Sequence, residues 1–212
     1  MWRRFGIGAC VVLWSLAASL ADTLQTPKPS DPQQVPGEYV TGNYGLIFQP
    51  PQKSFFCPLP KDWVGSDHGT FLFLKRPTAC YGAGYPSSSR GFEPPTTARI
   101  EVYYGYAPEP DEEKPQACKV AGTAMLFGKK VSLCKREWQG MTAISASGRY
   151  TADAPAEFSA TLVALPADQK AYMPMFLSFL ASVHACDAGW TDSRTGKHMG
   201  FRGARCPRTR WF

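Results

Sequence analysis

The chain has 212 residues and a formal net charge of +6 at pH 7, a length that is enough for one domain with its own core plus extensions. The charge is unevenly distributed. Residues 22–186 hold 15 basic and 15 acidic residues, whereas residues 187–212 hold six basic and two acidic ones. This distribution excludes a uniformly basic domain and assigns the excess charge to a C-terminal tail.

The N-terminus has the pattern of a secretory signal peptide, residues 1–21. Arg3 and Arg4 precede an apolar run over 5–20, and Ser19 and Ala21 occupy the small-residue positions before a cut. The run is too short and interrupted for a transmembrane anchor, so we expect export to a periplasmic or secreted, oxidising location. A lipidation box ending at Cys10 is the rival, but few residues precede it and the apolar run continues beyond it. The Arg3-Arg4 pair also suggests a twin-arginine signal, but the surrounding pattern is missing.

Six cysteines remain after Ala21, an even number that favours three disulfides in an oxidising compartment. Six cysteines allow about 15 pairings. We predict that sequence neighbours pair: Cys57 with Cys80, Cys118 with Cys134, and Cys186 with Cys206. A structural zinc site is the alternative, but no C-x-x-C spacing exists and the chain has three histidines. No metal or cofactor is expected.

Taken in chain order, residues 22–42 are rich in proline and polar residues, which predicts a linker. Strands are expected after it. The clearest is Arg99–Tyr106, where apolar and polar side chains alternate. A hairpin turn is expected at Gly128-Lys129, and Pro77–Pro95 and Pro108–Gln116 are expected to be long loops. The other predicted strands are Tyr44–Phe48, Ser54–Leu59, Thr70–Leu74, Thr123–Phe127, Lys130–Cys134, Gly140–Ser147 and Glu157–Ala164.

One helix follows the last strand. Asp168 or Tyr172 is expected to mark its start, and Pro174 suits its first turn. The side chains that recur at helical spacing are Phe176, Leu177, Leu180 and Val183. The helix is expected to end near Cys186. Together these elements predict an α+β domain over residues 43–186. It would be an antiparallel sheet of about six strands with one C-terminal helix packed on one face.

Residues 158–186 contain a strand, FSATLVAL, followed after a connection by a helix, MFLSFLASV. This pattern resembles the closing strand–helix unit of PsbP/Mog1-like α+β sandwiches. The resemblance implies a fold class. It implies no activity and no site residue, and the cysteines and basic tail depart from it.

Two groups of residues contain side chains that can take part in catalysis. His68 lies beside Asp67 in a Gly-Ser-Asp-His-Gly string and suits a general base. Glu109, Asp111, Glu112 and Glu113 are carboxylates, but the spacing of a calcium loop is absent. No G-x-S-x-G elbow occurs. A surface turn and a solvated loop explain these strings, so no catalytic residue is expected. His184 is expected to be partly buried at the end of the helix.

Two groups of residues suit the binding of a partner. Tyr81, Tyr85 and Phe92 lie in the loop over 77–95, where aromatic side chains anchor interfaces well. The tail, residues 187–212, interleaves aromatic side chains with six cations: Arg194, Lys197, Arg202, Arg205, Arg208 and Arg210. In an exported protein these cations suit anionic lipid, cell-wall polymer or an acidic protein rather than nucleic acid.

The sequence thus favours an exported, non-catalytic interaction protein, such as an inhibitor or immunity-type binder of a periplasmic or secreted enzyme. An envelope-associated module that binds anionic polymer or lipid through the tail is the alternative. A hydrolase that uses His68 is a second alternative. The oligomeric state stays open.

Overall fold

The computed structural model describes residues 31–35, 37–41, 44–57, 69–77, 97–106, 118–138, 140–150, 156–191, 196, 198–200 and 204–207. The predicted signal peptide, most of the two predicted long loops and the end of the tail lie outside the described residues.

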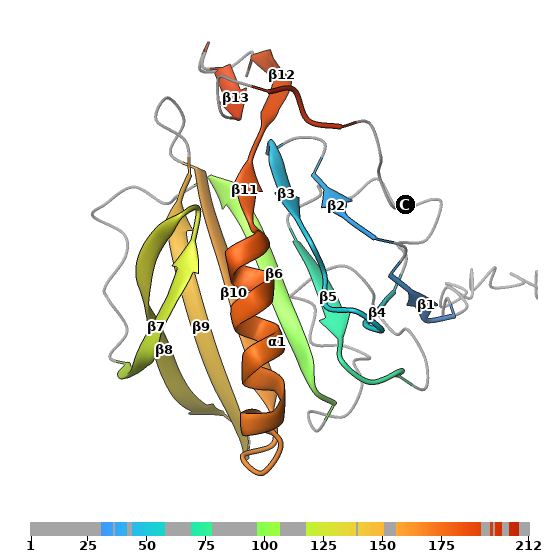
Figure 1. Ribbon diagram of the computed structural model, residues 1–212, viewed down its shortest axis with the longest axis vertical. Coiled ribbons are helices and arrows are strands. Elements are labelled where there is room, and N and C mark those ends of the chain that lie inside the picture. Colours follow the sequence, from blue (N-terminus) through green and yellow to red (C-terminus); the bar gives the residue numbers. More distant parts are fainter. Residues whose placement is uncertain are drawn as a thin grey trace, which may run out of the picture.

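Eight strands form one antiparallel sheet in the order β1-β4-β5-β6-β10-β9-β8-β7 (Figure 1). Its second half is a meander of four successive strands, and β10 then pairs with β6 in the centre of the sheet. The bounds are β1 Gln33–Gln34, β4 Phe55–Phe56, β5 Gly69–Phe73, β6 Arg99–Tyr106, β7 Lys119–Leu126, β8 Lys129–Trp138, β9 Met141–Arg149 and β10 Ala156–Ala164.

Strand β6 shows why this sheet has one apolar face. Ile100, Val102 and Tyr104 are fully buried, whereas Tyr103, between them, is 44% exposed. Successive side chains point to opposite faces of a strand, so the alternation in sequence becomes one face toward the core. The predicted strand Arg99–Tyr106 is confirmed.

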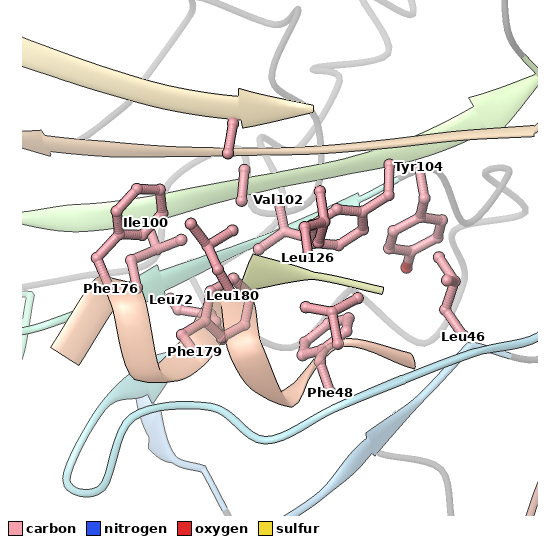
Figure 2. Close-up of a cluster of buried hydrophobic side chains, with 14 of the residues drawn as sticks. Leu46, Phe48, Leu72, Ile100, Val102, Tyr104, Leu126, Phe176, Phe179 and Leu180 are labelled. Carbon is pink, nitrogen blue, oxygen red and sulfur yellow. The ribbon is translucent and has the colours of Figure 1, made fainter. Parts of the chain in front are cut away.

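The helix α1, Gln169–Ser182, packs on the apolar face, where it contacts β7, β10 and β3. Figure 1 shows β7 and β8 bending around one side of it. Phe176, Phe179 and Leu180 are buried against the sheet (Figure 2). Burial of such side chains contributes about 1.5–3 kcal/mol each, which explains how the helix stays docked.

The helix begins at the earlier of its two expected starts, with Asp168 as its N-cap. Pro174 was expected in its first turn, yet the helix starts at Gln169 and includes Pro174 in its interior. Proline removes the bond to the carbonyl of Lys170. Because Pro174 is exposed and the buried side chains follow it, packing of the later turns offsets this loss.

A second sheet of three strands covers the same side of the molecule. It has the order β11-β3-β2, with β2 at Tyr39–Val40, β3 at Leu46–Phe48 and β11 at His184–Ala185. Tyr39 stacks on Phe48 with ring centroids 4.7 Å apart, and its hydroxyl lies 3.0 Å from that of Tyr104. Residues 22–42 were expected to be a linker, but β1 and β2 lie within them and Tyr39 and Val40 are buried.

The predicted fold class is wrong. In the described part of the chain the protein is mainly β, with an eight-stranded sheet, a three-stranded sheet, a two-stranded ribbon and one helix, not an α+β sheet of about six strands. Strands of two residues, such as β1 and β4, are too short to produce a period in the sequence. They become strands by pairing in turn at the edge of the sheet, β4 with β5 and β1 with β4.

The hairpin between β7 and β8 turns one residue earlier than predicted. Leu126 pairs with Lys129, so the turn residues are Phe127 and Gly128, with φ of 52° and 69°. Positive φ at both positions is typical of a type I′ turn. Phe127 adopts it because its ring packs 5.9 Å from Phe158 and 5.2 Å from Tyr150.

Candidate functional site in the C-terminal ribbon

Beyond the helix, the chain leaves the main domain as a short ribbon. We use "the ribbon" for the described residues between Cys186 and Pro207. It contains β12, Asp187–Thr191, paired with β13, His198–Gly200. Figure 1 shows this pair at the end of β11, away from the eight-stranded sheet.

A disulfide closes the ribbon at its base. Cys186 and Cys206 are bonded, with Cα atoms 5.0 Å apart, and they pack against Val40 and Ile47. The amide of Cys186 also donates to the carbonyl of Gly45 at 2.7 Å. The ribbon is therefore fastened to the three-stranded sheet by covalent, apolar and backbone contacts.

The predicted disulfides Cys186–Cys206 and Cys118–Cys134 are both confirmed; the second has Cα atoms 5.4 Å apart. Cys57 is also disulfide-bonded. Its predicted partner, Cys80, lies outside the described residues, so that pairing stays a prediction. The disulfides fit an oxidising compartment.

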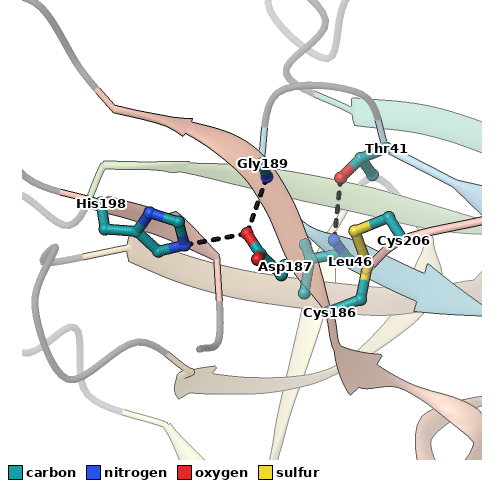
Figure 3. Close-up of a disulfide and its surroundings, with 7 residues drawn as sticks. All are labelled: Thr41, Leu46, Cys186, Asp187, Gly189, His198 and Cys206. Carbon is teal, nitrogen blue, oxygen red and sulfur yellow. Dashed lines mark hydrogen bonds and ion pairs between the residues drawn. A yellow bond between two sulfur atoms is a disulfide. The ribbon is translucent and has the colours of Figure 1, made fainter. Parts of the chain in front are cut away.

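Asp187 holds the ribbon together (Figure 3). Its amide donates to the carbonyl of Ala204, and its carbonyl accepts from the amide of Cys206, both at 2.9 Å. Its carboxylate accepts from the amide of Gly189 at 2.7 Å and from His198 Nε2 at 2.8 Å. One residue thus joins three segments of chain.

These contacts lower the pKa of the Asp187 carboxyl below its ordinary value of 3.8. The hydrogen bond from the Gly189 amide is the main cause, and His198 and the positive charge of Arg205 add to it. Donors that face a carboxylate favour its charged form. Gly189 can present its amide because it has φ of 76°, a conformation that suits glycine.

An aspartate that orients a histidine is also part of many hydrolytic sites. Here His198 and Asp187 are 24% and 18% exposed. Within the described residues, no serine, threonine or cysteine side chain is hydrogen-bonded to His198, and no group of metal-ligating side chains occurs. In this part of the chain the pair acts as a clamp on the ribbon.

Most of the predicted binding residues cannot be placed. Arg205 is described and exposed, and its guanidinium lies beside Gly189. The remaining eight lie outside the described residues, and so does His68: Tyr81, Tyr85, Phe92, Arg194, Lys197, Arg202, Arg208 and Arg210. His184 is exposed in β11 rather than partly buried, with Nδ1 2.9 Å from the carbonyl of Ser182.

A cleft of about 320 Å³ lies elsewhere, between the end of β1 and the turn before β4. Its lining includes Gln34, Gln49, Pro50 and Lys53. Its charged side chain, Lys53, is exposed, so the described lining offers no buried group for acid–base chemistry. No described helix is long and apolar enough to cross a membrane.

Searches against protein-family models, curated proteins and solved structures find no match to this chain. The resemblance to PsbP/Mog1-like sandwiches therefore stays a prediction. The sequence signal that could have revealed the clamp is the Asp-Ala-Gly turn at 187–189 directly after a cysteine.

Proposed function

We propose that this chain is an exported, non-catalytic interaction protein whose C-terminal ribbon binds an acidic surface on a protein partner. An inhibitor or immunity-type binder of a periplasmic or secreted enzyme fits this description. The supporting observation is that a basic segment, with six basic and two acidic residues over 187–212, begins in a ribbon fixed by a disulfide and by Asp187.

A rigid ribbon favours binding, because binding must order any side chain or backbone segment that is flexible in the free protein. Ordering a rotamer-rich side chain costs about 0.5–1.5 kcal/mol, and ordering backbone adds to this. A ribbon that is already closed by Cys186–Cys206 loses less entropy when a partner docks. The exposed Arg205 lies on this ribbon, so at least one of its cations is presented from a fixed backbone.

Binding of an anionic envelope polymer or lipid is the second candidate, and the charge distribution favours it as well. Six cations in the last 26 residues resemble a polybasic segment, for which attraction to an anionic membrane is about 1 kcal/mol per cation near the surface. The two candidates share the ribbon and differ in the source of the negative charge.

The test compares two charge-neutralised proteins. In the first, the six tail cations become glutamine. The control carries the same number of substitutions in the body: Lys28→Gln, Lys53→Gln, Lys75→Gln, Arg76→Gln, Arg149→Gln and Lys170→Gln. Each is offered to vesicles of phosphatidylcholine with phosphatidylglycerol, and to an extract of exported proteins followed by mass spectrometry at rising salt.

The protein-binding proposal expects one acidic exported protein that the wild type and the control retain and the tail variant loses. The lipid alternative instead expects vesicle binding that falls by roughly ten-thousandfold in the tail variant, because six cations at about 1 kcal/mol each amount to about 6 kcal/mol. Equal binding by the tail variant and the control in both assays would contradict the use of the ribbon.

A further inference from the structure

The first half of β7 is exposed at the edge of the eight-stranded sheet. We call residues Lys119–Thr123 the β7 edge. All five are exposed, so this stretch is uncovered on both faces, and Val120 is 66% exposed. Within the described residues β7 pairs with β8 and with no other strand. Helix α1 packs near β7, whose buried residues are Ala124 and Leu126, beyond this stretch.

An exposed strand edge presents unpaired N–H and C=O groups, and proteins usually protect such edges with charges, prolines or a covering element. The β7 edge has one charge, Lys119, followed by valine, alanine, glycine and threonine. The register shifts between Val120 and Gly122, and such a bulge, which twists the strand locally, is a further means of protecting an edge. Cys118–Cys134 ties its start to β8. The edge is therefore held in strand form without being covered.

The β7–β8 hairpin is also strongly basic. Residues 118–138 contain five basic residues and one acidic residue, for a net charge of +4. Lys135 pairs with Glu137 at 3.1 Å. Lys119, Lys129 and Lys130 are exposed and form no ion pair with a described residue. Lys119 lies on the β7 edge itself, whereas Lys129 and Lys130 lie on β8 opposite Leu126 and Met125. A docked strand would therefore meet the charge of Lys119 directly, and that of the other two lysines where it extends toward the turn.

We propose that the β7 edge accepts an extended acidic segment of a protein partner as an added strand of the sheet. In this mode the backbone hydrogen bonds supply affinity and the side chains supply specificity. Pairing with a second copy of β7 is disfavoured, because two hairpins of charge +4 would lie side by side. This surface lies on a different element from the ribbon and does not depend on it.

The experiment uses the mature chain and a synthetic octapeptide in which glutamate alternates with valine. Two matched peptides serve as controls: one has lysine in place of glutamate, and one is N-methylated at alternate backbone positions. Amide hydrogen exchange reports whether the β7 edge becomes paired, titration calorimetry gives the affinity, and sedimentation gives the oligomeric state.

The acidic octapeptide is expected to slow exchange in residues 120–123, and the two control peptides are not. Reversal of three hairpin charges, by Lys119→Glu, Lys129→Glu and Lys130→Glu, is expected to weaken binding by about tenfold. The matched reversal Lys53→Glu, Arg76→Glu and Lys170→Glu should leave it within about twofold. Glutamine substitutions in the tail should also leave it unchanged, which separates this surface from the ribbon.

Three results would overturn the proposal. The first is unchanged exchange in residues 120–123 with the acidic peptide present. The second is equal weakening by the hairpin and control reversals. The third is protection of the β7 edge without peptide in a dimer detected by sedimentation, which would identify a second copy as the occupant.

Discussion

Removal of the Cys186–Cys206 disulfide should release the ribbon while the eight-stranded sheet stays folded. The perturbation is Cys186→Ala with Cys206→Ala. Alanine is chosen because Cys186 is only 4% exposed and packs on Val40 and Ile47, where a serine hydroxyl would be buried. What then holds the ribbon is the set of hydrogen bonds at Asp187 and Cys186.

The size of the effect follows from the loop that the disulfide closes. Its sequence separation is 20 residues, which corresponds to about 3 kcal/mol in the chain-entropy account. A difference of 1.4 kcal/mol is a factor of ten in an equilibrium constant. The equilibrium for local opening of the ribbon should therefore rise by roughly a hundredfold.

Hydrogen exchange measures this opening at individual amides. Gly189 and Cys206 donate hydrogen bonds in the ribbon, so their protection should fall by roughly a hundredfold, while that of β6 and β10 should not change. The control is Cys118→Ala with Cys134→Ala, whose separation of 16 gives a similar energy but acts at β7. Equal loss in β6 and β10, or undiminished protection of the ribbon, would refute the view that the disulfide holds the ribbon as a separate unit.

Four further predictions concern single residues. Lys53→Gly should raise the free energy of unfolding by about 1 kcal/mol, because Lys53 has φ of 62° in an exposed turn. Phe127→Gly should instead lower the free energy of unfolding by about 2 kcal/mol, because ring packing on Phe158 is lost. Urea unfolding should therefore show that one glycine variant is stabilised and the other destabilised, and a change in the same direction for both would contradict this account. Asp187→Asn should reduce protection of the Gly189 amide at neutral pH. The folded pKa of Asp187 lies below 3.8, so the stabilisation is present above that pH and is lost as the pH falls through the folded pKa. Protection of the Gly189 amide should therefore become equal in wild type and variant in acid. A difference in protection that persists in acid would be evidence against the clamp. Gly69→Ala should destabilise the sheet by about 1–3 kcal/mol, because the added Cβ would collide with the carbonyl of Val102, and an unchanged urea midpoint would exclude that collision.

The strands that could be predicted from the sequence are those in which buried and polar side chains alternate along the strand itself. In β6 and β10, one face is buried and the other is polar, so burial produces a period of two along the chain. The helix was also predictable, because its buried side chains recur at helical spacing. The interior position of Pro174 was not, because rules for proline describe isolated helices and not the packing that holds Pro174 in an interior turn.

Other elements exist because of pairing between distant segments. Tyr39–Val40 lies in a proline-rich stretch, and it becomes a strand because β3 supplies hydrogen bonds and Phe48 and Tyr104 supply contacts. The disulfides Cys118–Cys134 and Cys186–Cys206 were predictable, because neighbouring cysteines flank compact pieces of chain. Of the Asp187 clamp, only the Asp-Ala-Gly turn has a signal in the sequence. The contacts with residues 204–206 do not, because they depend on pairing with a distant segment next to Cys206.

Because residues 22–186 are neutral overall and include the basic β7–β8 hairpin, the other residues in this range are acidic overall. Of the 15 basic and 15 acidic residues over 22–186, five basic and one acidic lie in residues 118–138, which leaves ten basic and fourteen acidic residues elsewhere in that range. The neutral body therefore combines a basic hairpin with an acidic remainder of net charge −4, and the tail adds a second basic region. Such an arrangement orients an approaching acidic partner at long range. Exposed charges further apart than about 8 Å are largely screened at physiological salt. Salt should therefore slow the association of an acidic partner more than it speeds its dissociation, and this holds whether the partner docks on the ribbon or on the β7 edge.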